Sequence, residues 1–412
     1  RMPNFKLLLA QIGVVLIAAR MVGWLFRRLH QPRVIGEMIA GILLGPSLLG
    51  WVAPGFSATL FAPDSLGAMG ALSQIGLLLF MFVVGLELDV RQLRALGRAA
   101  ALTSQASIFT PFLLGGILAF YLYPRLSDPS VNFISFSLFM GAAMSITAFP
   151  VLARILSEQM MMRTKMGSLA ITCAAINDVA AWCLLAVITM TVPTANLSLP
   201  LWMTLLGLGL FVFAMLTTVR RALQPLATHY ETHGGLGQDH LAIILLVVLA
   251  AGWITSALGV QALFGAFLAG TVMPQLPALR RDLWVRIEAL ISVLFLPLYF
   301  ALTGLRASFL LISGAQMWFY CAIVIAVAVI GKVGGATLGA RLTGLSWREA
   351  GAVGILMNTR GLVELVILNI GLDLGILSQA LFSMMVLMAL VTTLVTTPLL
   401  NWVYPARLPE GK

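Results

Sequence analysis

Residues 144–150 (MSITAFP) and residues 357–364 (MNTRGLVE) decide the fold that this sequence predicts. Each stretch lies inside a long apolar run and places helix-weakening residues near the middle of that run. Pro150 removes a backbone donor, and Asn358 and Gly361 weaken the second run. Irregular backbone at membrane depth is tolerated where it is buried in protein or lines a cavity. We therefore expect two interrupted helices inside a membrane protein.

The composition of the whole chain is that of a polytopic membrane protein. The 412 residues are 60% hydrophobic and 10% charged, whereas a soluble domain carries about 25% charged residues. Mean hydropathy is +1.01. This composition excludes cytosolic enzymes and disordered regulators. The net charge of +10 does not indicate a nucleic-acid binder, because the basic residues form short clusters between apolar runs.

Apolar runs, cut at charges and at Gly or Pro turns, predict thirteen membrane spans. Their ranges are 7–28, 33–51, 67–88, 98–123, 133–156, 165–192, 199–219, 240–257, 260–277, 285–305, 315–340, 349–372 and 379–403. With the N-terminus outside, eighteen of the 25 basic residues fall on the cytoplasmic side and four on the outer side. Because cytoplasmic loops are enriched in Lys and Arg, we expect a multi-pass protein of the cell (inner) membrane, with its C-terminus in the cytoplasm.

Thirteen spans divide into six, one and six, which gives the two halves opposite topology, as in many secondary transporters. The interrupted runs are spans five and twelve, at equivalent places in the two halves, and such a pair is the best sequence pointer to a transport site. The polar stretch 220–240 is predicted to be a cytoplasmic linker, and no large soluble domain is expected. Its His229, His233 and His240 are interpreted as part of a solvated loop, with pH sensing or metal binding left open.

Asp178 is the sharpest functional candidate, because an ionisable side chain at membrane depth costs about 2.5–3.5 kcal/mol or more. It lies near the middle of span six, beside Asn177 and among small residues that leave room for a solvated cavity. Ser145 and Thr147 of span five add two hydroxyls. Because hard oxygen ligands suit an alkali cation or a proton, a monovalent cation site is predicted at Asp178. The alternative is a structural aspartate paired with a buried base.

Three more charges fall at or near membrane depth in the second half of the chain. Arg360 and Glu364 are four residues apart, so they lie on one helix face and can pair, either for structure or for transport. Lys332 lies in span eleven among glycines that permit close helix approach. A lysine at this depth needs a carboxylate partner, and Asp178 or Glu364 is expected to supply it.

Five motifs follow one another along the whole chain. They are 36–47 (GEMIAGILLGPS), 82–89 (FVVGLELD), 145–150 (SITAFP), 175–182 (AINDVAAW) and 357–365 (MNTRGLVEL). Each alone is weak, but all five in order are specific. Together they resemble the monovalent cation:proton antiporter-2 family, which includes bacterial Kef-type and plant cation/H⁺ exchangers.

The resemblance implies an all-α NhaA-type fold, in which thirteen helices form an inverted repeat and the fifth and twelfth cross as broken helices. Residues 98–192 and 315–403 would form the core, ion-binding domain. Residues 7–88 and 199–305 would form the dimerisation domain of a homodimer. Transport is expected to follow an elevator-type alternating-access mechanism.

The resemblance also implies exchange of K⁺ or Na⁺ for H⁺, with no cofactor and no enzymatic activity. Asp178 matches the aspartate that binds cation and proton in turn, and Lys332 matches a lysine of the eleventh span. Electrogenic relatives carry two adjacent aspartates where this chain has Asn177 before Asp178, so electroneutral 1:1 exchange is expected. Likeness to plant exchangers over residues 358–375 favours K⁺. The Kef-type nucleotide-binding domain is absent from these 412 residues, so the chain is expected to be truncated or regulated otherwise.

Three other classes compete with this interpretation. A symporter of the same fold is disfavoured, because such symporters lack the Asn-Asp pair with a lysine on span eleven. A channel is disfavoured because no repeated filter occurs. Ser-His and His-zinc intramembrane proteases are excluded, since all four histidines, which are His30, His229, His233 and His240, lie in loops or at a rim. An aspartyl protease needs two opposed deep aspartates, and only Asp178 is deep.

Overall fold

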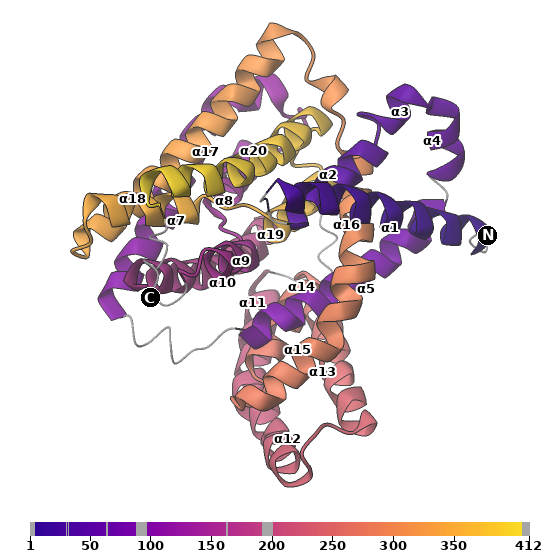
Figure 1. The fold of residues 1–412 in the computed structure, drawn as a ribbon, viewed down its shortest axis with the longest axis vertical. Helices are drawn as coiled ribbons and strands as arrows, with labels where there is room; N and C mark the ends of the chain where they lie inside the picture. The colour runs from indigo at the N-terminus through magenta and orange to yellow at the C-terminus, as the bar shows by residue number, and fades with distance from the viewer. Residues whose placement is uncertain are drawn as a thin grey trace, which may run out of the picture. The chain divides into compact units, whose positions relative to one another are not determined.

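The computed structural model describes residues 5–29, 31, 33–62, 65–87, 97–161, 164–191 and 201–405. Every regular element within these residues is helical (Figure 1). The predicted all-α class is therefore confirmed. Leu88 and Asp89 of the 82–89 motif lie outside the described residues.

Contacts divide the chain into two compact units. The first comprises residues 1–16, 60–89 and 189–302, and the second comprises residues 17–59, 90–188 and 303–412. The second unit holds most of the predicted core domain together with residues 17–59. The assignment of separate core and dimerisation roles stays a prediction.

The first unit is built mainly from apolar helices that pack through glycines. Its helices are α5 (Leu66–Glu87), α11 (Leu201–Ala214), α12 (Arg220–His233), α13 (Gln238–Ala257), α14 (Ala262–Thr271) and α15 (Pro277–Leu290), with π-helical turns at Met215–Val219 and Ile291–Phe295. Helices α5 and α14 approach closely, since a Cβ at Gly85 or Gly270 would lie 2.1 Å from a carbonyl oxygen of the other helix. Helices α1 (Phe5–Arg28) and α16 (Leu296–Arg306) each contribute residues to both units, and so do α4 (Pro54–Leu60) and α10 (Lys165–Thr191), whose last residues fall in the first unit.

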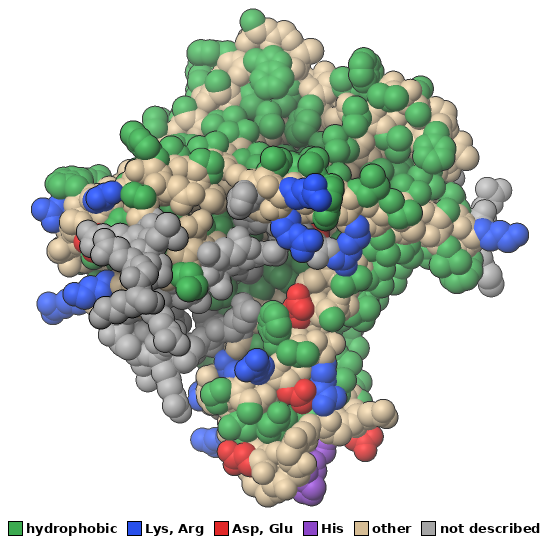
Figure 2. All heavy atoms as spheres, viewed as in Figure 1, with side chains coloured by type: hydrophobic (Ala, Val, Ile, Leu, Met, Phe, Trp, Pro, Cys, Tyr) green, Lys and Arg blue, Asp and Glu red, His purple; other side chains and the backbone are tan. Residues whose placement is uncertain are grey.

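Most of the predicted linker 220–240 is helical. Helix α12 continues α11 through a π-helical turn and ends at His233, where Gly234 adopts a φ of 70°. His229 of α12 stacks on His233 of the same helix and lies at a tilt to His240 of α13, with 4.1 Å between the ring centroids in each pair. Figure 2 shows histidine gathered at this end of the first unit. The expected loop is wrong for all three histidines, which lie in α12 and α13, because a polar composition marks exposure and not the loss of helix.

The second unit contains both interrupted runs. Its elements are α2 (Arg33–Leu44), α3 (Leu49–Val52), α4 (Pro54–Leu60), α7 (Gly97–Leu126), α8 (Phe133–Ser145), α9 (Phe149–Glu158), α10 (Lys165–Thr191), a 3₁₀ turn (Phe309–Leu311), α17 (Gly314–Leu342), α18 (Trp347–Met357), α19 (Leu362–Asp373) and α20 (Gln379–Val403). Helices α7 and α17 run close together, because Gly331, Gly335 and Gly339 of α17 face α7. A Cβ at Gly331 would lie 2.9 Å from Cα of Pro111. Small residues permit such close approach and bring Lys332, the next residue, against α7.

The described helices are long and apolar enough for a multi-pass membrane protein. By length and composition, ten of them could cross a membrane, or eleven when the bent pair α18 and α19 counts as one span. Two shorter apolar helices, α8 and α14, fall in predicted spans five and nine. The count of thirteen therefore stays a prediction. Hydrophobic side chains cover much of the surface visible in Figure 2.

Candidate functional site

The first interruption separates α8 from α9. Helix α8 ends at Ser145, α9 begins at Phe149, and residues 146–148 between them are not helical. Pro150 is the second residue of α9, where a missing N–H costs no intrahelical hydrogen bond. The break therefore lies just before the proline, as the start of a new helix, and is not a kink within one.

The second interruption, residues 358–361, bends α18 from α19 by 45°. The two interrupted segments contact each other. The Ala148 backbone N–H donates to the Thr359 carbonyl oxygen at 3.0 Å, and the Thr147 hydroxyl donates to the Met357 carbonyl oxygen at 2.8 Å. Polar backbone groups freed by one break thus find partners at the other.

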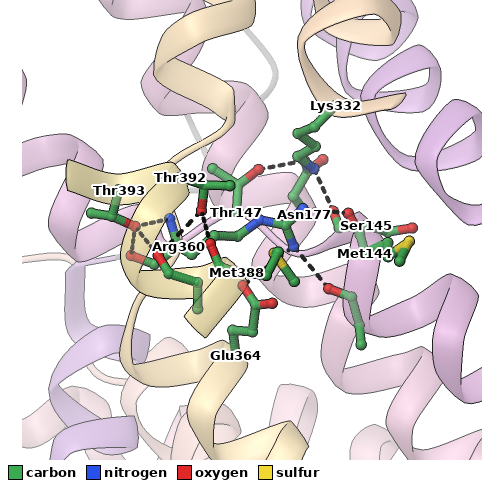
Figure 3. Close-up of polar contacts among 12 residues, drawn as sticks. Met144, Ser145, Thr147, Asn177, Lys332, Arg360, Glu364, Met388, Thr392 and Thr393 are labelled. Carbon is green, nitrogen blue, oxygen red and sulfur yellow. Dashed lines mark hydrogen bonds and ion pairs between the residues drawn. The ribbon is translucent and has the colours of Figure 1, made fainter. Parts of the chain in front are cut away.

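Arg360 binds the open end of α8. Its guanidinium donates to the carbonyl oxygens of Ala143 at 2.8 Å and Met144 at 2.7 Å, and it pairs with Glu364 at 3.2 Å (Figure 3). Both charged side chains are fully buried. The last carbonyls of a helix lack intrahelical donors and carry partial negative charge, so a cation is stabilising there. The predicted Arg360–Glu364 pair is therefore present and also joins the two broken helices.

Thr393 of α20 holds the backbone of Arg360, which the sequence did not indicate. Its hydroxyl lies 2.9 Å from both the N–H and the carbonyl oxygen of Arg360. The two residues are 33 positions apart, and threonine is common in apolar helices. No local signal in the sequence could have found this contact.

Lys332 binds oxygens that carry no formal charge. Its ammonium donates to the carbonyl oxygens of Ser107, at 3.0 Å, and Ser145. It forms no ion pair within 4.0 Å with Asp178 or Glu364, both of which the structure describes. The expected carboxylate partner is therefore wrong. Sequence reasoning missed the backbone carbonyls, which are invisible in side-chain patterns.

Asn177 supplies the third acceptor to Lys332. Its amide is assigned with Oδ1 toward Lys332 at 2.9 Å and Nδ2 toward the Cys173 carbonyl oxygen at 3.1 Å. The opposite orientation would set two donors against each other and two acceptors against each other. In the assigned orientation Oδ1 also lies 3.0 Å from the Ser107 hydroxyl and 3.3 Å from that of Thr147. An ammonium has three N–H groups, so Lys332 is fully satisfied by neutral oxygens.

Asp178 stands apart from these bonded groups. Its side chain is 2% exposed, and neither carboxylate oxygen has a hydrogen-bond partner among the described residues. The Phe149 backbone N–H, at the start of α9, faces the carboxylate but falls short of strict hydrogen-bond geometry, and the Lys332 ammonium acts on the carboxylate through its charge. Burial of an ionised carboxylate costs free energy unless a partner compensates its charge. Asp178 therefore has the chemistry of a group that binds a cation or a proton.

The remaining predicted residues lie in or beside the two interruptions. The Ser145 hydroxyl donates back to the Gly141 carbonyl oxygen at 2.7 Å. Asn358 is buried, with its Oδ1 unpartnered, and Gly361 is the residue that precedes α19. A Cβ at Gly361 would lie 2.8 Å from the Val151 side chain, so a glycine fits this close approach.

Two interrupted helices that meet near a buried, unpartnered carboxylate are the architecture of a secondary transporter. The chain belongs to the family described as sodium/hydrogen exchanger, transmembrane, which matches residues 15–403. This is a family of membrane transporters, and it confirms the resemblance drawn from the five motifs.

Curated relatives and a solved structure agree with this assignment. The chain is 43% identical over 401 residues to the Na⁺/H⁺ antiporter NhaS4 of Synechocystis sp., covering 97% of this chain and 98% of that protein. It is 42% identical over 407 residues to cation/H⁺ antiporter 19 of Arabidopsis thaliana, covering 97% of this chain and 50% of that protein. The chain thus spans about half the length of this plant relative.

The fold resembles that of the sodium proton antiporter MjNhaP1 from Methanocaldococcus jannaschii. The TM-score is 0.63, with 13% identity, and the match covers 95% of each chain. At this identity the likeness shows the fold alone.

Proposed function

We propose that the chain exchanges a monovalent alkali cation, Na⁺ or K⁺, for a proton, with Asp178 as the group that carries each in turn. One observation carries the proposal: both Asp178 oxygens are buried without a partner, beside the start of α9. The printed names of the relatives, a Na⁺/H⁺ antiporter and a cation/H⁺ antiporter, support the same activity.

The exchange is proposed to be electroneutral, one cation for one proton. Glu364 is engaged with Arg360, and Lys332 is satisfied by neutral oxygens. The described residues contain three buried carboxylates, Glu37, Asp178 and Glu364, and Asp178 is the one that lies beside the start of α9 and forms no ion pair. A single carboxylate releases one proton when it accepts one cation, so no net charge moves in a full cycle.

We propose that transport follows an elevator-type alternating-access mechanism. This mechanism suits a single carboxylate that binds the cation and the proton at different times. In this proposal residues 98–192 and 315–403 carry Asp178 across the membrane against a homodimeric scaffold of residues 7–88 and 199–305. The chain would lie in the inner membrane with its C-terminus in the cytoplasm. Proton and cation compete for Asp178, so neither moves inward without the other moving outward.

The test uses purified protein in proteoliposomes with a pH-sensitive dye inside. An external pulse of K⁺, Na⁺, Rb⁺ or Li⁺ should make the lumen more alkaline, and the four cations should differ in half-maximal concentration. A symporter would acidify the lumen instead. A channel would carry current without dye-reported proton movement. The absence of any cation-driven pH change would overturn the proposal.

A further inference from the structure

Lys332 contacts α7 at the carbonyl of Ser107, which lacks its usual helical N–H donor because of a proline. In a regular α-helix the carbonyl of residue 107 accepts from the N–H of residue 111. Residue 111 is Pro111, which lies inside α7 and has no N–H. The Ser107 carbonyl oxygen instead accepts from the Lys332 ammonium at 3.0 Å.

Ser107 acts on Lys332 a second time through its side chain. Its hydroxyl lies 3.0 Å from the Asn177 oxygen that also faces Lys332. The other acceptor near this hydroxyl is the Ser104 carbonyl oxygen at 2.9 Å, which already receives the helical N–H of Ile108. A carbonyl oxygen has two lone pairs, so the hydroxyl proton has two acceptors within reach. We assign the proton to Asn177, whose oxygen it helps to fix toward Lys332.

We propose that Ser107 is a positioning residue that holds Lys332 on neutral oxygens and so leaves the Asp178 carboxylate to the transported cation. The proposal rests on the proposed function of Asp178 as the cation carrier. Lys332 and Asp178 already act on each other electrostatically without an ion pair. Loss of the Ser107 carbonyl as an acceptor, or loss of the hydroxyl that fixes the Asn177 oxygen toward Lys332, weakens the hold on one N–H of Lys332. That N–H then turns to Asp178 and competes with the cargo.

Ser107→Ala removes the hydroxyl of Ser107, which we call the hydroxyl arm of the proposal, and keeps the backbone carbonyl, which we call the carbonyl arm. The KM and the maximal rate of exchange are measured separately for K⁺ and for Na⁺ in proteoliposomes at constant pH. We expect KM to rise about fivefold, the factor that corresponds to one hydrogen bond of about 1 kcal/mol. The maximal rate at saturating cation should stay within about twofold of the unmutated protein, since cation at high concentration displaces Lys332. Ser107→Thr keeps a hydroxyl and should return KM toward the original value.

The chain offers a matched control one turn away. Ser104 is also a buried serine of α7, but its hydroxyl donates to the Ala101 carbonyl oxygen at 3.1 Å, within its own helix. Ser104→Ala should therefore leave both KM and maximal rate unchanged. Equal KM values for Ser107→Ala and Ser104→Ala would overturn the hydroxyl arm of the proposal.

Pro111→Ala tests the carbonyl arm, which is the hydrogen bond from Lys332 to the Ser107 carbonyl oxygen. Its melting temperature shows whether a change in KM comes from a loss of folding. It returns an N–H to α7, which stabilises the helix and competes with Lys332 for the Ser107 carbonyl. We expect an equal or higher melting temperature together with a raised KM, a combination that general damage cannot produce. An unchanged KM in Pro111→Ala would overturn this arm.

Failure of this inference is distinguishable from failure of the proposed function. If the unmutated protein exchanges cations and Asp178→Asn does not, but Ser107→Ala and Pro111→Ala both keep the original KM, the positioning role is wrong and the function stands. If Asp178→Asn still exchanges cations, the proposed function is wrong, and the positioning role falls with it.

Discussion

The Arg360 guanidinium donates to the Met144 carbonyl oxygen at 2.7 Å, which joins one interrupted helix to the end of the other. The same side chain pairs with Glu364 at 3.2 Å, where both residues are fully buried. Removal of one partner of a buried ion pair costs about 3–5 kcal/mol, because the other charge is left uncompensated. The contact between the two interrupted segments therefore depends strongly on Arg360.

Arg360→Met is accordingly expected to lower the melting temperature strongly, by the equivalent of about 3–5 kcal/mol. Glu364→Gln should cost less, because Arg360 keeps its two carbonyl partners on α8. Tryptophan fluorescence during heating in detergent measures both. Equal melting temperatures for Arg360→Met and the unmutated protein would show that the pair does not hold the crossing together.

Lys332→Ala is expected to be destabilising even though Lys332 has no carboxylate partner. The change removes the ammonium donor from the buried carbonyl oxygens of Ser107 and Ser145, and each unsatisfied buried group costs about 1–3 kcal/mol. The Asn177 oxygen loses one donor but keeps the Ser107 hydroxyl. Lys332→Arg should retain more stability, because it keeps a cationic donor. A melting temperature for Lys332→Ala that matches the unmutated protein would place Lys332 outside the buried network.

The sequence predicted much of the architecture of this site. Pro150, Asn358 and Gly361 marked the two interruptions correctly, since prolines, glycines and short polar residues weaken helices by local chemistry. Asp178 was a candidate because an ionisable side chain at membrane depth is costly, and this too can be read from the residue and the apolar run around it. Its role as cation carrier is still a proposal.

The partners of Lys332 could not be predicted in the same way. Its acceptors are two backbone carbonyls and an amide, 155 to 225 positions away along the chain. Backbone groups leave no trace in a side-chain pattern. One signal was available, because Pro111 lies inside the run 98–123 and a proline in a helix frees the carbonyl four residues earlier, here that of Ser107.

Exchange is expected to produce no net current. In the proposed function Asp178 is the carboxylate that carries the cargo and forms no ion pair, so one proton leaves for each cation that binds. Solid-supported-membrane electrophysiology measures this directly, with the same cation jumps that drive the dye response. A robust cation-dependent current that changes with imposed voltage would reveal a second titrating group, and Glu364 would be examined first.

The turn between α7 and α8 is expected to respond to acid. The Ser130 backbone N–H and then its hydroxyl hold the pKa of Asp128 below its ordinary value of 3.8. A lowered pKa means that the ionised carboxylate stabilises the fold above pH 3.8 and that this contribution is lost as the pH falls through the lowered pKa. The melting temperature of Asp128→Ala should therefore lie below that of the unmutated protein at neutral pH. The gap should close in strong acid, and a gap that is constant with pH would contradict this assignment.

Asp178→Asn tests the central claim most directly, because it keeps the shape of the side chain and removes its ability to ionise. The variant should melt at a temperature equal to or above that of the unmutated protein, since a neutral amide costs less to bury than an unpartnered carboxylate. In proteoliposomes, pulses of K⁺ or Na⁺ should then produce no change in luminal pH. Substantial cation-driven proton movement by folded Asp178→Asn would contradict the account.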